Sequence, residues 1–209
     1  MAKETQPTKG ERTRRAILDA AKNLFLRQGY AATGMRQIAR AVGITPAAIY
    51  NHFAGKDGIF AALLEEAAPF EEALELLEKT EADTAGDLLR KTVRAIVGLF
   101  ANHEDYIRLA LIDAQERNGT AVVTFPPQLF PHFMAFYQRL VALDAERGRL
   151  RDLSPFVFNR TLFSLIAGYI ITEYVAKPAR TLDLPDMDWV EGLVDIFLHG
   201  VLKPLQAKA

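Results

Sequence analysis

Apolar positions recur with helical spacing through the first quarter of the 209-residue chain. Such spacing places the apolar side chains on one face of a helix, with polar and basic residues on the other. The pattern predicts an amphipathic helix from about residue 11 to residue 28, with this apolar stripe: Ile17, Ala21, Leu24, Phe25. Gly29 follows at the position where helices commonly end.

Two further short helices are predicted before residue 56. The first covers residues 35–41, and Gly43 then provides the positive φ of a tight turn. Thr45 is a good N-cap and Pro46 suits a first helical position, so the next helix is predicted over 46–52. Three helices with a glycine turn between the second and third predict a helix-turn-helix.

The remainder of the chain is also helical by period, with no sustained alternation of the kind that strands show. We expect an all-α fold: a three-helix helix-turn-helix domain over residues 1–56, with a disordered tail of about ten residues, and an all-helical ligand-binding and dimerisation domain over residues 57–209. About nine helices are expected in all. Those after residue 55 are predicted near residues 56–79, 84–102, 104–117, 127–147, 155–176 and 187–203.

The charge changes this picture because it is unevenly distributed. The whole chain has a formal net charge of −1. Residues 1–56 hold ten Lys and Arg against three Asp and Glu, a net of +7, whereas residues 57–209 carry −8. A basic segment with its own apolar periodicity indicates a domain that binds a polyanion, joined to a body with a different role.

The candidate chemistry of other classes is sparse. With no Cys, a disulfide scaffold, a thiol nucleophile and a Cys zinc site are excluded. The four His form no metal-binding pair of known spacing, and no phosphate-binding or nucleophile-elbow motif occurs. We therefore expect no enzyme activity, no metal and no cofactor. Residues 1–15 are polar and 162–172 look too short to cross a membrane, which favours a cytoplasmic protein.

The stretch from Thr13 to Phe60 resembles the DNA-binding domain of the TetR family of bacterial transcription regulators. The resemblance is strongest at the run from Ala48 to Phe53 followed by Gly55-Lys56, close to the family pattern A-L-Y-x-H-F-x-x-K. Other matching positions are Ile17, Ala20, Ala21, Phe25, Gly29, Tyr30, Thr33, Arg36, Ile38, Ala39, Gly43, Ile44 and Thr45. The resemblance implies that the third helix enters the major groove, which is wide enough for one helix.

Several side chains of this domain are candidates for DNA contact. Tyr50 and His52 can donate to phosphate oxygens, and the resemblance implies phosphate contacts by both. Lys56 lies at a helix start, where the helix dipole disfavours a cation, so a shared phosphate would explain it. The full set of expected DNA-binding residues is Arg36, Gln37, Thr45, Pro46, Ala47, Tyr50, Asn51, His52 and Lys56.

The predicted recognition helix carries no Arg or Lys, so bidentate readout of guanine from it is excluded. Base reading is then expected from Thr45, Ala47 and Ala48 against thymine methyl groups and from Asn51 against adenine, with Arg36 or Gln37 adding to it. DNA shape would supply part of the specificity. Gly34 stands where the family usually has a Ser or Thr cap, so one phosphate contact of the family is in doubt.

A helix-turn-helix protein normally binds DNA as a two-fold dimer. The predicted helix over 155–176 is apolar nearly all round and must be covered on two sides, which a four-helix bundle across the two-fold axis would do. The core helix of a monomer is the alternative. The expected dimer residues are Phe158, Leu162, Leu165, Gly168, Val190, Val194, Phe197 and Val201.

The resemblance also implies a ligand pocket among the middle helices, suited to a small apolar or aromatic molecule. The candidate pocket residues are Phe100, Tyr106, Arg108, Phe130, Phe133, Tyr137, Phe163 and Tyr169. Asp113, His132 and Glu173 are further candidates for its polar groups. The resulting hypothesis is a ligand-responsive homodimer that represses from a palindromic operator and is released by a small-molecule effector. The alternative is a helical ligand-binding or interaction module that does not read DNA, which salt-dependent DNA binding would distinguish.

Overall fold

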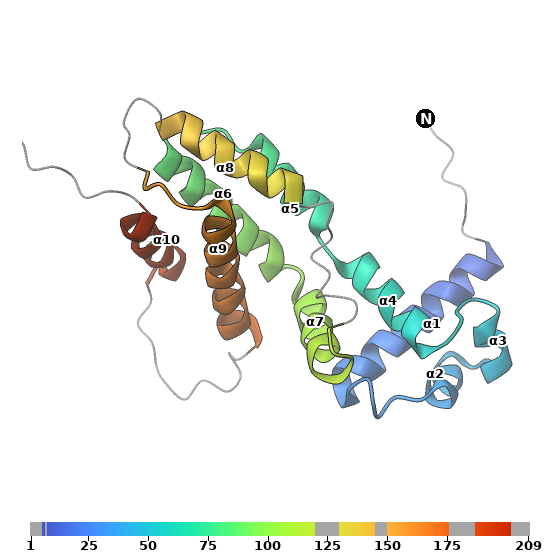
Figure 1. Ribbon diagram of the computed structural model, residues 1–209. Coiled ribbons are helices and arrows are strands. Elements are labelled where there is room, and N and C mark those ends of the chain that lie inside the picture. The colour runs from blue at the N-terminus through green and yellow to red at the C-terminus, as the bar shows by residue number, and fades with distance from the viewer. Residues whose placement is uncertain (1–5, 7, 120–129, 145–149, 176–186, 202–209) are drawn as a thin grey trace, which may run out of the picture. The chain divides into compact units, whose positions relative to one another are not determined.

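The computed structural model describes residues 6, 8–119, 130–144, 150–175 and 187–201, and the elements it shows are helices (Figure 1). The all-α fold expected from the sequence is confirmed. The helices gather into two compact units. Unit 1 comprises residues 1–68 and 105–124, and unit 2 comprises residues 69–104 and 125–209.

Unit 1 extends beyond residue 56, where the sequence predicted the end of the DNA-binding domain. It also includes a helix that lies much later in the sequence. Its helices are α1 (Lys9–Gln28), α2 (Met35–Val42), α3 (Pro46–Tyr50), α4 (Lys56–Ala67) and nearly all of α7 (Glu104–Glu116). Helix α1 begins earlier than predicted because Thr8 and Glu11 form a reciprocal capping box. The apolar stripe of α1 packs against both α2 and α4.

The core of unit 1 contains an aromatic cluster on α1, α4 and the loop after α1. The ring centroids of Phe25 and Phe60 lie 5.2 Å apart, and Tyr30 lies 5.5 Å from Phe25 and 5.2 Å from Phe60. Phe25 and Phe60 are completely buried. Edge-to-face contacts of this kind add to the free energy gained by burying the rings.

Unit 2 is built around one central helix. Its elements are α5 (Phe70–Lys79), α6 (Ala85–Ala101), α8 (Phe130–Asp144), α9 (Pro155–Ile170), the π-helical turn η2 (Ile171–Val175) and α10 (Trp189–Val201). Helix α6 packs against α5, α8, α9 and α10. Its buried residues Leu88, Leu89 and Val93 therefore form the middle of the core.

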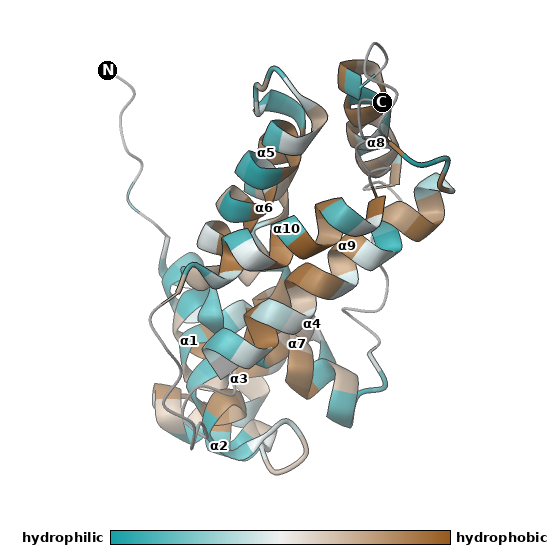
Figure 2. Ribbon diagram, turned by 90° about the vertical axis from the view of Figure 1, so that its left-hand side faces the viewer, coloured by the Kyte–Doolittle hydropathy of each residue, from teal (hydrophilic) through white to brown (hydrophobic). Residues whose placement is uncertain are grey.

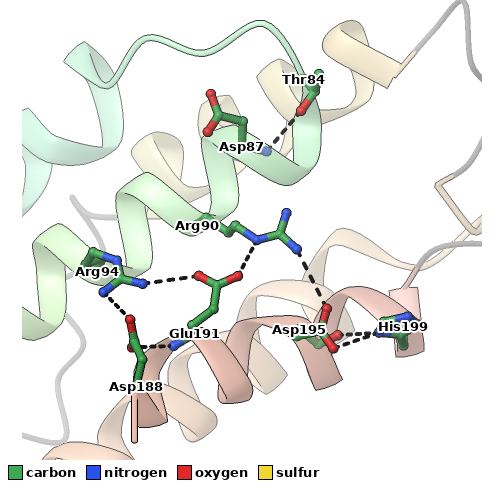
Figure 3. A network of polar contacts seen from close by, with 8 residues as sticks. All are labelled: Thr84, Asp87, Arg90, Arg94, Asp188, Glu191, Asp195 and His199. Atoms are coloured by element: carbon green, nitrogen blue, oxygen red, sulfur yellow. Dashed lines mark hydrogen bonds and ion pairs between the residues drawn. The ribbon is translucent and has the colours of Figure 1, made fainter.

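A charged network joins α10 to α6 (Figure 3). Arg90 Nε lies 2.7 Å from Glu191 Oε1, and Arg94 bridges Glu191 and Asp188 at 3.1 and 2.8 Å. Arg90 also lies 3.7 Å from Asp195. Single exposed ion pairs stabilise little, whereas several charges that share partners fix the relative orientation of two helices.

The single helix predicted over 56–79 is wrong, because α4 ends at Ala67 and α5 begins at Phe70. Pro69 has no N–H to donate, and it forces Ala68 into an extended conformation with ψ 120°. The acidic residues on both sides hid this break, because they continue one polar pattern across it. Residues 127–129, 145–147, 176 and 202–203 of other predicted helices lie outside the described residues.

Helix α9 is longer than the apolar run seen in the sequence. Together with η2, residues Pro155–Tyr174 are long and apolar enough to cross a membrane by length and composition alone. A core helix passes the same test, and the inner face of α9 packs against α6 and α8. Figure 2 shows α9 as a mostly hydrophobic ribbon. Its outer face is apolar and exposed, at Phe156, Val157 and Phe163.

The end of α1 gives a first testable prediction. Gly29 has φ 86° and ψ 167°, a region that only glycine adopts readily, and a Cβ there would lie 2.7 Å from Glu116 Oε1. Gly29→Ala is expected to lower the free energy of unfolding by about 1–3 kcal/mol, measured by urea denaturation. Gly98→Ala is the matched control, because Gly98 is an exposed helical glycine and a Cβ there would have no heavy atom within 4 Å. This substitution should stabilise α6 by about 0.5–1 kcal/mol. Equal effects of the two substitutions would contradict the strained role of Gly29.

Candidate nucleic-acid interface

Helices α2 and α3 expose a polar surface, and buried apolar residues on their opposite faces pack in the core. Ile38 and Ala39 of α2 and Ile49 of α3 are buried. Seven of the nine expected DNA-binding residues are exposed, and the other two, His52 and Lys56, are half-buried. The exposed seven are Arg36, Gln37, Thr45, Pro46, Ala47, Tyr50 and Asn51.

Helix α3 is only five residues long, and local contacts define both of its ends. Thr45 Oγ1 accepts a hydrogen bond from the Ala48 N–H at 3.3 Å, and Pro46 occupies the first helical position. Ile49 is anchored in the core, so the next residue, Tyr50, faces outward with 57% of its surface exposed. The helix end thus presents a phenol hydroxyl that is free to reach a phosphate oxygen.

The start of α2 is capped without a hydroxyl. The Gly34 N–H donates to Gln37 Oε1 at 2.7 Å, which is one half of a capping box, and no side chain takes the place of the missing Ser or Thr hydroxyl. Gln28 Nε2 donates to the Ala32 carbonyl at 3.0 Å and to Thr33 Oγ1 at 3.2 Å. Gln37, expected from the sequence to read bases, therefore has a structural role for its oxygen, and its amide nitrogen remains for base contact.

Lys56 also has a structural role that the sequence did not indicate. Its Nζ donates to the Tyr30 carbonyl at 2.8 Å and to the Thr33 carbonyl at 2.9 Å, and it lies 4.0 Å from the centre of the Tyr30 ring. These contacts occupy two of its three donors and explain a cation at the start of α4 without a phosphate. Burial lowers the pKa of Lys56, while Asp57 and Glu116 oppose that shift.

Arg117, directly after α7, contacts the same Tyr30 ring as Lys56 although it lies in the second sequence segment of unit 1. Its guanidinium lies 2.6 Å from Asp113 Oδ1 and 2.9 Å from Asp57 Oδ1, and it covers the rings of Tyr30 and Phe60 at 5.0 and 4.7 Å. The Tyr30 hydroxyl donates to Asp57 at 2.8 Å. Hydrogen bonds from Arg117 and Tyr30 hold the pKa of Asp57 below its usual value.

Glu116 contributes a third contact to the loop between α1 and α2. Its Oε2 accepts from the Ala31 N–H at 2.6 Å. The loop of residues 29–34 is therefore fixed by Glu116, by Lys56 and by the ring contacts of Tyr30. Because this loop leads directly into α2, the end of α7 and the start of α4 together determine where the exposed face of α2 lies. We call these residues the loop clamp: Tyr30, Lys56, Asp57, Asp113, Glu116 and Arg117.

Most of the loop clamp cannot be predicted from local sequence patterns. Arg117 and Asp57 are 60 positions apart, and their pairing follows only from the return of the chain to unit 1 after unit 2 has begun. The backbone turns directly after α7, with positive φ at Asn118 and Gly119.

The expected dimer residues are mostly placed elsewhere by the structure. Phe158, Leu162, Val194, Phe197 and Val201 are between 1% and 7% exposed and form the core of unit 2 within a single chain. These five side chains therefore pack within one chain, and a role at a dimer surface stays a prediction for them. Leu165 and Val190 are half-buried, and Gly168 is exposed.

The expected pocket residues are divided between the two units. Tyr106 and Arg108 belong to unit 1, whereas the remaining six belong to unit 2: Phe100, Phe130, Phe133, Tyr137, Phe163 and Tyr169. Phe130 is exposed and stacks on Phe156 at 5.4 Å, and Phe163 is also exposed. The Tyr137 hydroxyl donates to the Leu153 carbonyl at 2.8 Å.

Two polar candidates for the pocket have structural partners instead. Asp113 is fully buried against Arg117, and His132 Nδ1 lies 2.6 Å from Glu78 Oε1. Burial raises the pKa of Tyr106 to about 12, so its hydroxyl stays protonated at neutral pH. Among the described residues, no group of three or more His, Asp and Glu side chains could hold a metal ion.

Comparison with known proteins gives consistent matches. Residues 17–63 match the family described as bacterial regulatory proteins, tetR family. The chain is 26% identical to YvkB, an HTH-type transcriptional regulator of Bacillus subtilis (strain 168), over 90% of this chain and 97% of that protein. It is 30% identical to an HTH-type transcriptional regulator of Haemophilus influenzae over 53% of each chain.

Solved structures of similar fold extend over nearly the whole chain. NalD of Pseudomonas aeruginosa, described as the secondary repressor of the MexAB-OprM multidrug efflux pump, matches with a TM-score of 0.67 and 29% identity, over 93% of this chain and 99% of NalD. The fatty acid degradation regulator FadR of Bacillus halodurans shares the fold, with a TM-score of 0.65 and 18% identity over 99% of this chain and 100% of that one. The resemblance inferred from the sequence is confirmed.

The buried pair of the loop clamp gives the second prediction. Arg117→Met would remove the guanidinium that neutralises the fully buried carboxylate of Asp113, so we expect the free energy of unfolding to fall by about 3–5 kcal/mol. Asp57→Asn removes the exposed partner of the same guanidinium and should cost less than about 1 kcal/mol. Chemical denaturation of the full chain measures both, and a loss in Arg117→Met no larger than that in Asp57→Asn would contradict the assignment.

Proposed function

We propose, from the premise that the chain belongs to the tetR family of bacterial regulatory proteins, that it is a repressor which binds a palindromic operator as a homodimer and is released by a small apolar or aromatic effector. The observation that best supports DNA binding is the exposed polar face of α2 and α3. Buried Ile38 and Ile49 anchor these helices in the core, and the segment of residues 1–56 to which they belong has a net charge of +7. Operator selection from genomic fragments, repeated with candidate effectors, tests the proposal.

In this proposal α3 enters the major groove and its neighbours bind the backbone. Tyr50 and His52 at the end of α3 donate to phosphates, and Arg36 does so from the first turn of α2. Lys56 has one donor left for a phosphate, which makes its contribution smaller than the sequence suggested. Most of the affinity that does not depend on sequence comes from the release of counterions by the basic residues.

Sequence reading by α3 is modest because this helix carries no Arg or Lys. The exposed Ala47 fits a thymine methyl group, and the exposed Asn51 has the donor and acceptor that adenine requires. Thr45 keeps its hydroxyl proton for a base or phosphate, since its oxygen already accepts from the Ala48 N–H. Operator shape supplies the remaining specificity.

The dimer surface is assigned anew to the exposed apolar side chains of α9, η2 and α10. These are Phe156, Val157, Phe163, Ile171, Trp189 and Ile196, with exposed fractions from 38% to 74%. Phe158 and Phe197, whose rings lie 5.3 Å apart, hold α9 against α10, so both helices belong to one rigid surface. A second copy of the chain would cover this face and form a four-helix bundle across the two-fold axis.

Release by an effector follows from a shift of population. An effector that binds one arrangement of the helices more tightly favours that arrangement, in which the spacing of the two recognition helices no longer fits the operator. The chain passes from unit 1 to unit 2 between α4 and α5, at Ala68-Pro69, and α4 begins with the loop clamp residues Lys56 and Asp57.

The third prediction concerns Tyr50. Loss of a hydrogen bond to a charged phosphate weakens binding by about tenfold or more per half-site, and Tyr50→Phe is expected to do so on operator and random DNA alike. Fluorescence anisotropy with both DNAs measures this loss. Tyr137→Phe is the control, since its hydroxyl donates within unit 2 and should leave DNA affinity unchanged. Unchanged affinity in Tyr50→Phe would refute the phosphate contact.

The fourth prediction concerns the dimer. Ile196 is the most exposed large apolar side chain in the described part of the chain, at 74%, so Ile196→Glu leaves the folded chain intact and places a charge in the proposed interface. We expect a monomer by light scattering after size exclusion, with the helical circular dichroism unchanged. Val141→Glu introduces the same charge at an exposed apolar position of α8 and should remain dimeric. A dimeric Ile196→Glu variant would overturn this surface.

A further inference from the structure

Thr92 lacks the backbone hydrogen bond that several other hydroxyl residues of this chain form. Thr13, Thr80 and Thr172 each donate to the carbonyl four positions earlier, at 2.9, 2.6 and 2.9 Å. Thr92 lies in the middle of α6 and is 1% exposed, yet its hydroxyl has no hydrogen-bond partner among the described residues. Its buried oxygen therefore lacks the backbone partner that the other three hydroxyl groups have.

Asn159 shows the same feature on α9. Its Nδ2 donates to the Pro155 carbonyl at 2.9 Å, which fixes the amide and leaves Oδ1 as an acceptor. That oxygen is buried and has no partner within the part of the chain that the structure describes. Asn159 lies between the core residues Phe158 and Leu162, and α9 packs against α6.

Buried polar groups in folded proteins are nearly all hydrogen-bonded, so each of these two atoms needs an explanation. An unpartnered group carries the full cost of its removal from water. Both atoms belong to unit 2, whose core consists mainly of Leu, Val, Ile and Phe side chains. A molecule that binds there and supplies the missing partners would recover this cost.

We propose that Thr92 and Asn159 are the polar anchors of the effector site, and that the site takes an uncharged apolar molecule carrying a hydroxyl or N–H group. The inference rests on the proposed function, since it identifies the chemistry of the effector. Asn159 Oδ1 can only accept, so the effector donates to it. The Thr92 hydroxyl both donates and accepts, so it bonds to the same hydroxyl group or to a second polar atom. Neither anchor is charged, so a charged effector would be buried without a counter-charge from them.

The first experiment needs no effector. Thr92→Val keeps the shape of the side chain and removes an unpartnered hydroxyl, so the melting temperature should stay the same or rise. Thr80→Val removes a hydroxyl that does have a partner and should lower it by about 2–4 °C. If Thr92→Val lowers the melting temperature as much as Thr80→Val, the Thr92 hydroxyl has a structural partner and the proposal fails.

The second experiment measures binding of paired probes to the full chain by equilibrium dialysis: 1-naphthol against naphthalene, and 4-hexylphenol against hexylbenzene. Each pair differs by one hydroxyl. The wild-type protein is expected to bind at least one hydroxylated probe about tenfold more tightly than its hydrocarbon. Thr92→Val and Asn159→Leu should reduce that ratio toward one while hydrocarbon binding is kept, and Thr92→Ser should restore it.

Either of two results overturns the proposal: a wild-type protein with no preference for any hydroxylated probe, or variants that keep the full preference. Operator binding without probe is measured in parallel on the same preparations. If the wild-type protein binds no operator, the proposed function fails whatever the probes show. If the wild-type protein binds operator but binds each hydroxylated probe no more tightly than its hydrocarbon, only the proposed effector chemistry is wrong.

Discussion

The arrangement of the DNA-facing surface depends on one cation held between two elements that are distant in the sequence. Lys56 binds the carbonyl groups of Tyr30 and Thr33, and both this ammonium and the guanidinium of Arg117 contact the ring of Tyr30. Two cations on one aromatic ring require nearby anions, and Asp57 and Asp113 supply them. The loop before α2 is thereby fixed to α4 and α7, so contacts from these two helices position the exposed face of α2 and α3.

The local elements were predictable because each depends on nearby residues. The stripe from Ile17 to Phe25 predicts α1, and Thr45-Pro46 predicts the start of α3, since capping and periodicity act within a few positions. The break at Pro69 follows from equally local chemistry but was hidden by the acidic residues around it. Exposure of most of the expected DNA-contact residues also agrees with the pattern, because Ile38 and Ile49 face the core while Gln37 and Tyr50 beside them are exposed.

The sequence does not show which helix or which chain covers the apolar face of a given helix. The stripe Val194, Phe197 and Val201 shows that one face of α10 is buried, but it cannot show whether α6 or a second chain buries it. Arg90 and Arg94 of α6 answer this by binding Glu191 of α10 and Asp188 directly before it (Figure 3), which leaves Ile196 on the outer face. The same limit applies to Arg117 and to the orphaned oxygens of Thr92 and Asn159, whose meaning depends on tertiary contacts.

The central claim is that the loop clamp positions the DNA-binding surface. Its effect on operator affinity can be measured separately from its effect on stability. Replacing both Asp113 and Arg117 with Leu and Met removes a buried ion pair as a unit, which is often nearly neutral for folding. It also removes the contacts of Arg117 with Asp57 and Tyr30. The decisive measurement is the operator affinity of this double variant by fluorescence anisotropy, beside its melting temperature. The account predicts a melting temperature close to that of the wild type and an operator affinity about tenfold weaker. Wild-type affinity in a folded double variant would contradict it.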